Sequence, residues 1–212
     1  MQRFAVHSGI AALLDRDNID TDQIIPKQFL KRTERTGYGN CLFFDWRFDA
    51  AGRPNPTFAL NAPQYAGASI LIAGKNLGCG SSREHAVWAL RDYGFRAVIA
   101  SSFADIFAGN CVKNGLVPVV LRPSEIAALK ARDVSGRFQL TVDLENCEVR
   151  ARDGFSAHFE IDAFRRTCLL EGLDEIGMTM RHEAEITAYE KRRNKPVTLH
   201  PRLINGEHVT SI

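Results

Sequence analysis

A glycine-rich loop carries the residue types that chemistry most often needs. The stretch LGCGSSREHA, residues 77–86, contains two serines followed by an arginine: Ser81, Ser82 and Arg83. Glycines let the backbone approach a ligand closely, and the first turn of a following helix offers free N–H groups and the positive end of its dipole. The arginine adds a planar fork for a carboxylate, and such a field stabilises a serine alkoxide. The stretch therefore predicts an anion site that is able to hold an activated serine.

Familiar nucleotide and hydrolase motifs do not fit this loop. A P-loop requires GxxxxGK[ST], a dinucleotide fingerprint requires a third glycine where this chain has Arg83, and a hydrolase elbow requires GxSxG rather than GCGSS. A zinc-protease HExxH sequence is also absent. The simpler alternative is a helix start in which Ser81 or Ser82 is the N-cap and Glu84 favours the first turn. The pattern alone favours this alternative, because helix caps are far commoner than catalytic serines.

Apolar runs rich in isoleucine and valine predict strands on either side of the loop. The runs cover residues 68–74, 96–100 and 116–121. Between them, helical spacing of apolar residues predicts two helices, one from Ser81 or Ser82 to a stop at Gly94 and the other over 102–115. Alternating strands and helices are typical of an α/β layer with parallel strands and right-handed crossovers. The loop that contains Ser81, Ser82 and Arg83, called the serine–arginine loop below, then joins a strand to the helix that follows it.

The second half of the chain has a different pattern. Residues 124–133 predict a short helix. Residues 137–161 alternate polar and apolar, with turn residues at two points, which predicts an antiparallel hairpin or meander. Two further helices are predicted over 162–172 and 177–194.

The length of 212 residues allows one large domain. The proline-containing stretch at 52–64 is expected to be a loop that links the N-terminal piece to the α/β core. We expect a single domain over residues 1–200, followed by a flexible tail at 201–212.

Charge and composition exclude several function classes. The 27 basic and 25 acidic residues leave a net charge of +2, which gives no electrostatic footprint for nucleic acid. The N-terminus lacks the pattern of a signal peptide, and no apolar run is long enough for a membrane span. The five cysteines form no CxxC pair, so neither a zinc site nor a disulfide framework is indicated. We therefore expect a cytoplasmic protein with reduced thiols, no metal of its own, and no nucleic-acid or membrane partner.

Three long motifs together resemble one enzyme family. GCGSSREHA, DNIDTDQIIP at 17–26 and SFADIFAGNCVKNGLVPV at 102–119 are similar to the small subunit of 3-isopropylmalate dehydratase (isopropylmalate isomerase), the swivel domain of the aconitase superfamily made as a separate chain. The resemblance extends over 36–48, 63–76 and 162–177. It implies an aconitase-type swivelling β/β/α domain, with three layers, a parallel βαβ core and an additional antiparallel hairpin.

The resemblance also implies a reaction. In that family, 2-isopropylmalate and 3-isopropylmalate are interconverted through 2-isopropylmaleate, a hydro-lyase step of leucine biosynthesis. A [4Fe-4S] cluster in the separate large subunit polarises the leaving hydroxyl, and the small subunit supplies the base. The implied partners are therefore a cluster-bearing large subunit and a small dicarboxylate, with no cofactor on this chain, which is expected to be inactive alone.

Residue roles can be carried over at the matching motifs. Ser81 corresponds to the serine that takes and returns the carbon-bound proton, and Ser82 and Arg83 correspond to groups that bind a substrate carboxylate. In the motif at 17–26, Asp20 and Thr21 are candidates for orienting Arg83 or the substrate. Asp17 is expected only to form caps and turn hydrogen bonds ahead of a short helix.

The segment 27–39 corresponds to a loop that helps to select the side group on the malate. Phe29 and Leu30 are candidates for contact with the isopropyl group. Archaeal-type relatives read Tyr-Leu-Arg-Thr here and this chain reads FLKRT, so the basic residue that holds the second carboxylate is either Lys31 or Arg32, with Thr33 beside it.

Several other polar and aromatic residues near the motifs have two interpretations. His85 is expected to make a structural contact rather than act as an acid, and Cys79 is a spacer unless its thiol is exposed with a depressed pKa. Asn110, Lys113 and Asn114 line the cleft or cap their helix, with neither interpretation favoured. The tryptophans, Trp46 and Trp88, are expected in the core or at a subunit interface.

Two alternative functions stay open at this point. The first is a related hydro-lyase acting on homoaconitate, on citramalate or citraconate, or on another methylated malate, which the segment 27–39 would decide. The second is an anion-binding or RNA-binding regulatory module, which the balanced charge disfavours.

Overall fold

A computed structural model of the chain describes residues 1–31, 36–132 and 137–193. The chain divides into two compact units, Met1–Glu175 and Ile176–Ile212. The first unit contains all the strands of the described chain. The tail expected at 201–212 lies outside the described residues.

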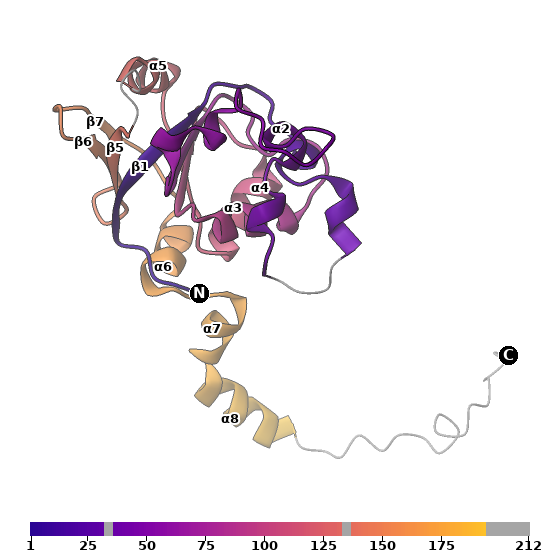
Figure 1. Cartoon of the computed structure of the whole chain (residues 1–212). Helices are drawn as coiled ribbons and strands as arrows, with labels where there is room; N and C mark the ends of the chain where they lie inside the picture. The colour runs from indigo at the N-terminus through magenta and orange to yellow at the C-terminus, as the bar shows by residue number, and fades with distance from the viewer. Residues whose placement is uncertain (32–35, 133–136, 194–212) are drawn as a thin grey trace, which may run out of the picture. The chain divides into compact units, whose positions relative to one another are not determined.

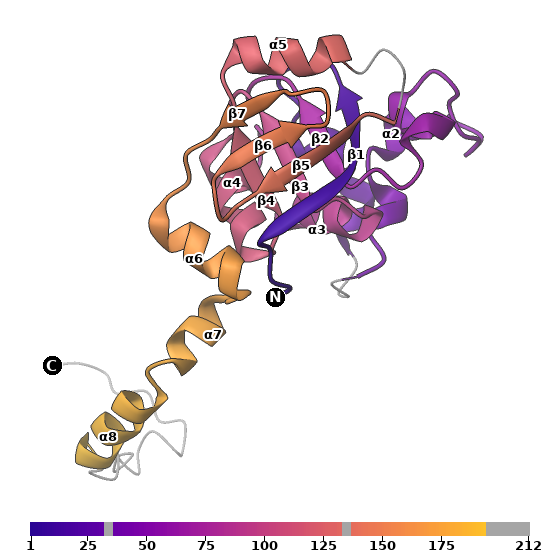
Figure 2. The same cartoon turned by 90° about the vertical axis from the view of Figure 1, so that its left-hand side faces the viewer.

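One seven-stranded sheet organises the first unit, with the order β4-β3-β2-β1-β5-β6-β7. The strands are β1 (Val6–Leu14), β2 (Ile70–Ala73), β3 (Ala97–Ala100), β4 (Val117–Val120), β5 (Gln139–Asp143), β6 (Glu148–Ala151) and β7 (Ser156–His158). Strands β1 to β4 pair in parallel, and β1, β5, β6 and β7 pair antiparallel. Strand β1 serves both halves, because Val6–Ile10 pairs with β5 and Ala11–Leu14 pairs with β2. Figure 2 shows the meander β5–β7 beside β1.

Alternate residues of the parallel strands face opposite sides of the sheet, as the pleat requires. Leu71 and Ala73 belong to one buried cluster, and Ile70 and Ile72 belong to the other. Each leucine or isoleucine buried in this way contributes roughly 1.5–3 kcal/mol to stability.

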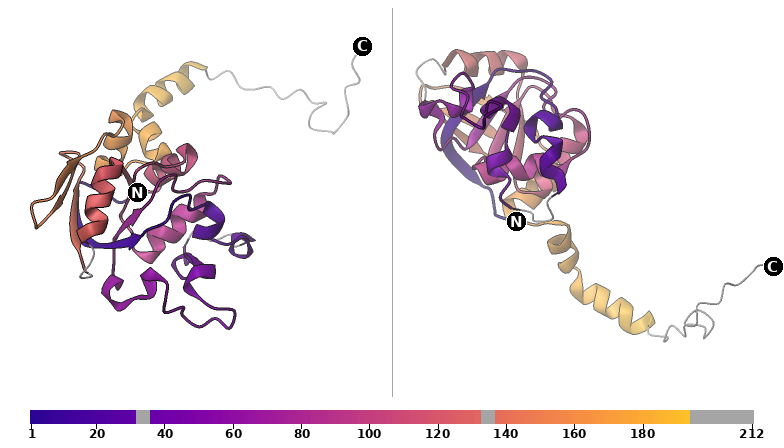
Figure 3. Two further views of the ribbon diagram at one scale, coloured as in Figure 1. Left: turned by 90° about the horizontal axis from the view of Figure 1, so that it is seen from above. Right: turned by 45° about the vertical axis from the view of Figure 1, so that its right-hand side comes forward.

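Helices cover both faces of the parallel half. The α-helices of the first unit are α1 (Thr21–Ile24), α2 (Phe44–Arg47), α3 (Glu84–Tyr93), α4 (Asp105–Lys113), α5 (Pro123–Arg132) and α6 (Ala163–Glu171). Residues of α1, α3 and α4 share a cluster with one face of the sheet, and residues of α5, α6 and the meander share a cluster with the other face. Figures 1 and 3 show α3 and α4 on the side of the parallel strands away from the orange meander. The meander therefore packs on the parallel strands, which confirms the expected β/β/α layering.

Most predicted elements are confirmed. The three apolar runs are β2, β3 and β4, the alternating segment is the meander, and the helix predicted at 124–133 is α5. The loop expected at 52–64 lies between α2 and β2 and includes the short 3-10 helix Ala59–Asn61. The N-terminal piece that it joins to β2 is itself part of the core, because β1 lies between β2 and β5 in the middle of the sheet.

The second unit contains helical segments in its described part. The helix α7 (Glu175–Met180) begins at the unit boundary, and α8 (Glu183–Arg193) follows it, so the single helix predicted over 177–194 is two helices. Every helix in the described part of the chain is too short or too polar to cross a lipid bilayer.

Candidate functional site

The three motif segments meet at one edge of the sheet. They follow the parallel strands β1, β2 and β3, whose carboxyl ends lie side by side. Isolated parallel bridges join Asp20 to Cys79 and Leu77 to Phe103. The loop between β2 and α3 therefore lies between the segments that follow β1 and β3, and the fold brings the three motifs of the sequence together.

Thr21 holds the serine-bearing loop by its backbone. The Thr21 side chain is buried, its N–H donates to the Cys79 carbonyl at 3.0 Å, and its Oγ1 donates to the Ser81 carbonyl at 2.7 Å. Asp20 caps α1, because its Oδ1 accepts from the Gln23 N–H at 2.9 Å and the Gln23 side chain accepts from the Asp20 N–H at 3.1 Å. Thr21 therefore holds the loop at Ser81 itself, whereas the Asp20 side chain caps α1.

Gly78 is required by both backbone conformation and space. Its φ is +78°, in the region that favours glycine, and a Cβ at this position would lie 2.1 Å from Cγ of Phe107. Because Phe107 is buried in the core, the loop lies against α4 at this point and has no room for a side chain.

We expect Gly78→Ala to destabilise the fold by about 2–4 kcal/mol, because it combines backbone strain with overpacking against Phe107. The melting temperature should fall by roughly 5–10 °C in calorimetry of the isolated chain. Gly109→Ala is the matched control, since Gly109 lies inside α4 and its added Cβ meets nothing within 4 Å. That control should raise stability by up to about 1 kcal/mol, and equal melting temperatures for the two variants would contradict the prediction.

The two serines do not cap the helix. Helix α3 begins at Glu84, and Arg83 occupies the N-cap position without a side-chain capping hydrogen bond. The expectation of a helix start at Ser81 or Ser82 is therefore wrong. Both serines are exposed, and among the described residues neither hydroxyl forms a hydrogen bond. Neither serine is therefore the N-cap of the helix, and both hydroxyls are available to a ligand.

Arg83 is held by an acid that the sequence did not single out. The guanidinium forms an ion pair with Oδ1 of Asp22, and the Arg83 side chain is only 15% exposed. Lys27 approaches the other oxygen of Asp22, with Nζ to Oδ2 at 3.5 Å. Asp22 lies in the first turn of α1, two residues after the Asp20 cap. A carboxylate between two cations fixes the position of Arg83 beside Ser81 and Ser82.

The Cys79 thiol is not activated. Burial, followed by the charge of Asp20, raises the pKa of Cys79 above its ordinary value. A raised pKa lowers the thiolate fraction at neutral pH, which disfavours a reactive cysteine.

We expect Cys79→Ala to leave the function of this loop within about twofold of the parent, because a thiol whose pKa is raised is a poor reacting group. Only the backbone carbonyl of Cys79 contacts Thr21, and alanine retains it. Steady-state kinetics check this result, and a loss of turnover would make the thiol a candidate reacting group again.

The expected specificity segment is described in part. Phe29 and Leu30 are half-buried and pack against the core, with the Phe29 ring 5.0 Å from that of Phe44. Lys31 is exposed at the end of a short 3-10 helix. Arg32 and Thr33 lie outside the described residues, so the choice between Lys31 and Arg32 stays a prediction.

An aromatic cluster lies behind the serine–arginine loop. The His85 ring lies 5.5 Å from Tyr38 and 4.6 Å from Trp88, in accord with a packing role. Trp46 stacks on Phe43 at 5.5 Å elsewhere in the core. Both tryptophans are half-buried and pack against the core.

The described residues do not fit a metal centre. In the described ranges, no group of three or more His, Cys, Asp or Glu is arranged to hold a metal ion. All five cysteines are free, and burial raises the pKa of Cys111 well above its ordinary value.

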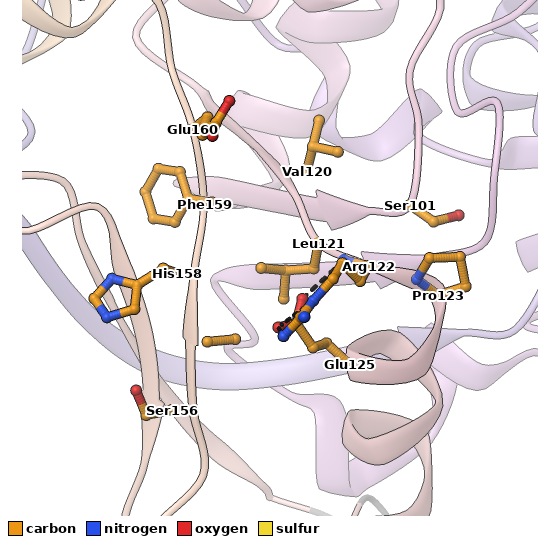
Figure 4. A pocket seen from close by; sticks show the side chains of 11 residues that line it. Ser101, Val120, Leu121, Arg122, Pro123, Glu125, Ser156, His158, Phe159 and Glu160 are labelled. Atoms are coloured by element: carbon orange, nitrogen blue, oxygen red, sulfur yellow. Dashed lines mark hydrogen bonds and ion pairs between the residues drawn. The ribbon is translucent and has the colours of Figure 1, made fainter.

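A separate cavity of about 710 Å³ lies beyond the end of β4 and is lined by none of the predicted site residues. Its cation, Arg122, is already paired with Glu125, with Nε to Oε1 at 3.0 Å, as Figure 4 shows. This hydrogen bonding also lowers the pKa of Glu125. The arginine that lines this cavity is therefore already paired with a carboxylate of the same cavity.

Family models match three parts of the chain. The Aconitase C-terminal domain matches residues 1–124, and a model described as LeuD_N matches residues 132–163. The C-terminal domain of the 3-isopropylmalate dehydratase small subunit matches residues 175–195.

Curated proteins and one solved structure are similar over most of the chain. The 3-isopropylmalate dehydratase small subunit of Koribacter versatilis is 58% identical, covering 90% of this chain and 98% of that protein. The protein of the same name from Rhodopirellula baltica is 58% identical over 91% of this chain and 100% of its own length. The crystal structure of 3-isopropylmalate dehydratase from Methanocaldococcus jannaschii superposes with a TM-score of 0.63 at 26% identity, covering 87% of this chain and 99% of that chain.

Proposed function

The chain belongs to the family of 3-isopropylmalate dehydratase small subunits, and on this premise we propose that its serine–arginine loop supplies the proton-transfer and carboxylate-binding groups of that enzyme. The enzyme is a hydro-lyase of leucine biosynthesis that interconverts 2-isopropylmalate and 3-isopropylmalate through 2-isopropylmaleate, and this chain has the function of its small subunit. One observation carries the proposal: two exposed serines that do not cap the helix lie beside an arginine that forms an ion pair with Asp22.

Ser81 is the proposed base. As an alkoxide, its Oγ removes the proton from the carbon next to a carboxylate, and the C–H electron pair becomes the alkene bond as hydroxide leaves the neighbouring carbon. In the hydration direction, the same hydroxyl returns the proton to the carbon that lost the hydroxide. A proton at such a carbon is weakly acidic, so a strong base is needed in a field of donors and cations. The hydrogen bond from Thr21 to the Ser81 carbonyl supports the role by holding the backbone of this residue.

Ser82 and Arg83 are the proposed carboxylate site. Arg83 presents a charged fork, and the free N–H groups of the first turn of α3 lie directly after it. Asp20 and Thr21 act on this site through the loop, and Phe29, Leu30 and the basic residue at Lys31 or Arg32 meet the remainder of the substrate.

A large subunit is the partner of the chain, since a small subunit implies one. We propose that the partner carries a [4Fe-4S] cluster, which would supply a Lewis acid for the leaving hydroxyl. The exposed serines support a shared site, because an alkoxide base requires a surface that covers it and excludes water. A cytoplasmic location is also proposed, in accord with five free cysteines.

The direct test is co-expression with candidate large subunits, followed by an alkene-absorbance assay on 3-isopropylmalate. The complex should form 2-isopropylmaleate, and each chain alone should be inactive. Faster turnover of homoaconitate or citramalate than of isopropylmalate would instead select the related hydro-lyase. Failure to pair with any cluster-bearing chain would contradict the proposal.

A further inference from the structure

The side chain of Asn114 joins α4 to the first turn of α3. Its Nδ2 donates to Oε1 of Glu84 at 2.8 Å and to the Asn110 carbonyl at 2.9 Å. Its Oδ1 accepts from Nε1 of Trp88 at 3.0 Å. Both amide hydrogens and the amide oxygen are thus used, and Asn114 is also the C-cap residue of α4.

The chemistry of the partners fixes which way the amide points. The Trp88 indole only donates, so it meets the amide oxygen, and an ionised Glu84 carboxylate only accepts, so it meets the amide nitrogen. Glu84 and Trp88 are four residues apart and therefore share one face of α3. One side chain consequently contacts both the first turn of α3 and the turn that follows it.

Trp88 extends this arrangement toward the segment 27–39. Its ring lies 5.8 Å from that of Tyr38, which is fully buried where this segment re-enters the core. The Tyr38 N–H donates to Oδ2 of Asp92 on the same helix at 3.0 Å. Helix α3 therefore follows the serine–arginine loop directly and contacts the end of the segment 27–39 with its side. A shift of α3 would displace both.

We propose that Asn114 is a positioning residue for the reaction, acting through Glu84 and Trp88 on the placement of Arg83 and Ser81. The inference rests on the proposed function of that loop. Asn114 touches no reacting atom in this scheme, and its effect is to hold α3 against α4, so that the carboxylate fork and the base keep their separation.

Exchanging the hydrogen-bond donor and acceptor tests the contact. Asn114→Asp places a carboxylate against Glu84 and should lower kcat/KM of the complex on 3-isopropylmalate by about 10- to 100-fold, the loss typical of a displaced reacting group. Glu84→Gln keeps an acceptor for Asn114 and should stay within about threefold of the parent. In the double variant, the new amide at position 84 donates to the new carboxylate at position 114, so kcat/KM should recover to near the Glu84→Gln value.

A second variant and a second measurement distinguish loss of the contact from misfolding of the protein. Asn114→Ala should also lower kcat/KM, whereas Asn110→Ala is the matched control, because Asn110 contributes its backbone carbonyl to the contact. In a Trp46→Phe background, Trp88 is the single tryptophan left of the two in the chain, and its indole N–H resonance in the full-length protein reports the contact. The resonance should shift in Asn114→Asp and return in the double variant.

The outcomes separate this inference from the proposed function. An inactive parent complex contradicts the proposed function, while the indole resonance still reads the contact. An active parent complex whose Asn114→Ala variant matches Asn110→Ala overturns the inference, and so does a double variant whose loss equals the product of the two single losses.

Discussion

Ser81→Ala is expected to remove turnover by the reconstituted complex while leaving assembly with the large subunit intact. Removal of a positioned proton-transfer group lowers kcat by about 10²–10⁴-fold. The change deletes one exposed oxygen that forms no hydrogen bond among the described residues, so the folded structure has little reason to change. The Ser81 carbonyl that accepts from Thr21 is retained in alanine, which keeps the loop in place.

Two other serine variants serve as comparisons for Ser81→Ala. Ser124→Ala removes an exposed hydroxyl from α5 and should leave kcat and KM unchanged. Ser82→Ala should mainly raise KM, because it removes a proposed carboxylate ligand rather than the proposed base. Stopped-flow alkene absorbance measures turnover, and size-exclusion chromatography measures assembly. Near-normal turnover by an assembled Ser81→Ala complex would end the assignment of Ser81 as the base.

The elements that could be predicted are those whose pattern is local. Strands β2 and β3 are continuous apolar runs because both faces of a central parallel strand are buried, and every residue of each strand is buried in the structure. The meander shows the alternation of a sheet with one packed face. Helix ends at Gly94 and Gly172 are visible because a positive φ there favours glycine.

Strand β1 was not predicted, for a physical reason. Its sequence, VHSGIAALL, combines a half that pairs antiparallel with β5 and a more buried half that pairs in parallel with β2. The two halves follow different burial rules, so no single period extends over the strand. Only the assembled sheet determines where one environment ends and the other begins.

The site divides in the same way between local and long-range signals. The serine–arginine loop is recognisable from its residues, and the resemblance assigns Ser81 its role. The pairing of Arg83 with Asp22 and the contact of Thr21 with Ser81 were not predictable, because they join segments about 60 positions apart in the chain. These contacts depend on the carboxyl ends of β1 and β2 lying side by side, which the sequence pattern did not reveal while β1 was missed.

Arg83→Lys is expected to raise KM by about 10- to 100-fold with a smaller change in kcat, since charge-assisted hydrogen bonds contribute roughly 1.5–3 kcal/mol. Lysine keeps the positive charge that pairs with Asp22, so the ion pair stays neutral overall and the fold is retained. It loses the planar fork that meets both oxygens of a carboxylate. The loss should therefore appear in substrate binding rather than in the proton transfer that we propose for Ser81.

Arg91→Lys is the matched control for this change, because Arg91 is exposed on the same helix and its replacement should leave KM unaltered. Asp22→Asn supplies the complementary measurement. It removes the charge that orients Arg83 while keeping the fork, so KM should rise without loss of the arginine itself. If Arg83→Lys instead lowered kcat as strongly as Ser81→Ala and left KM unchanged, Arg83 would serve the chemical step. The division between a serine that moves the proton and an arginine that holds the carboxylate would then be wrong.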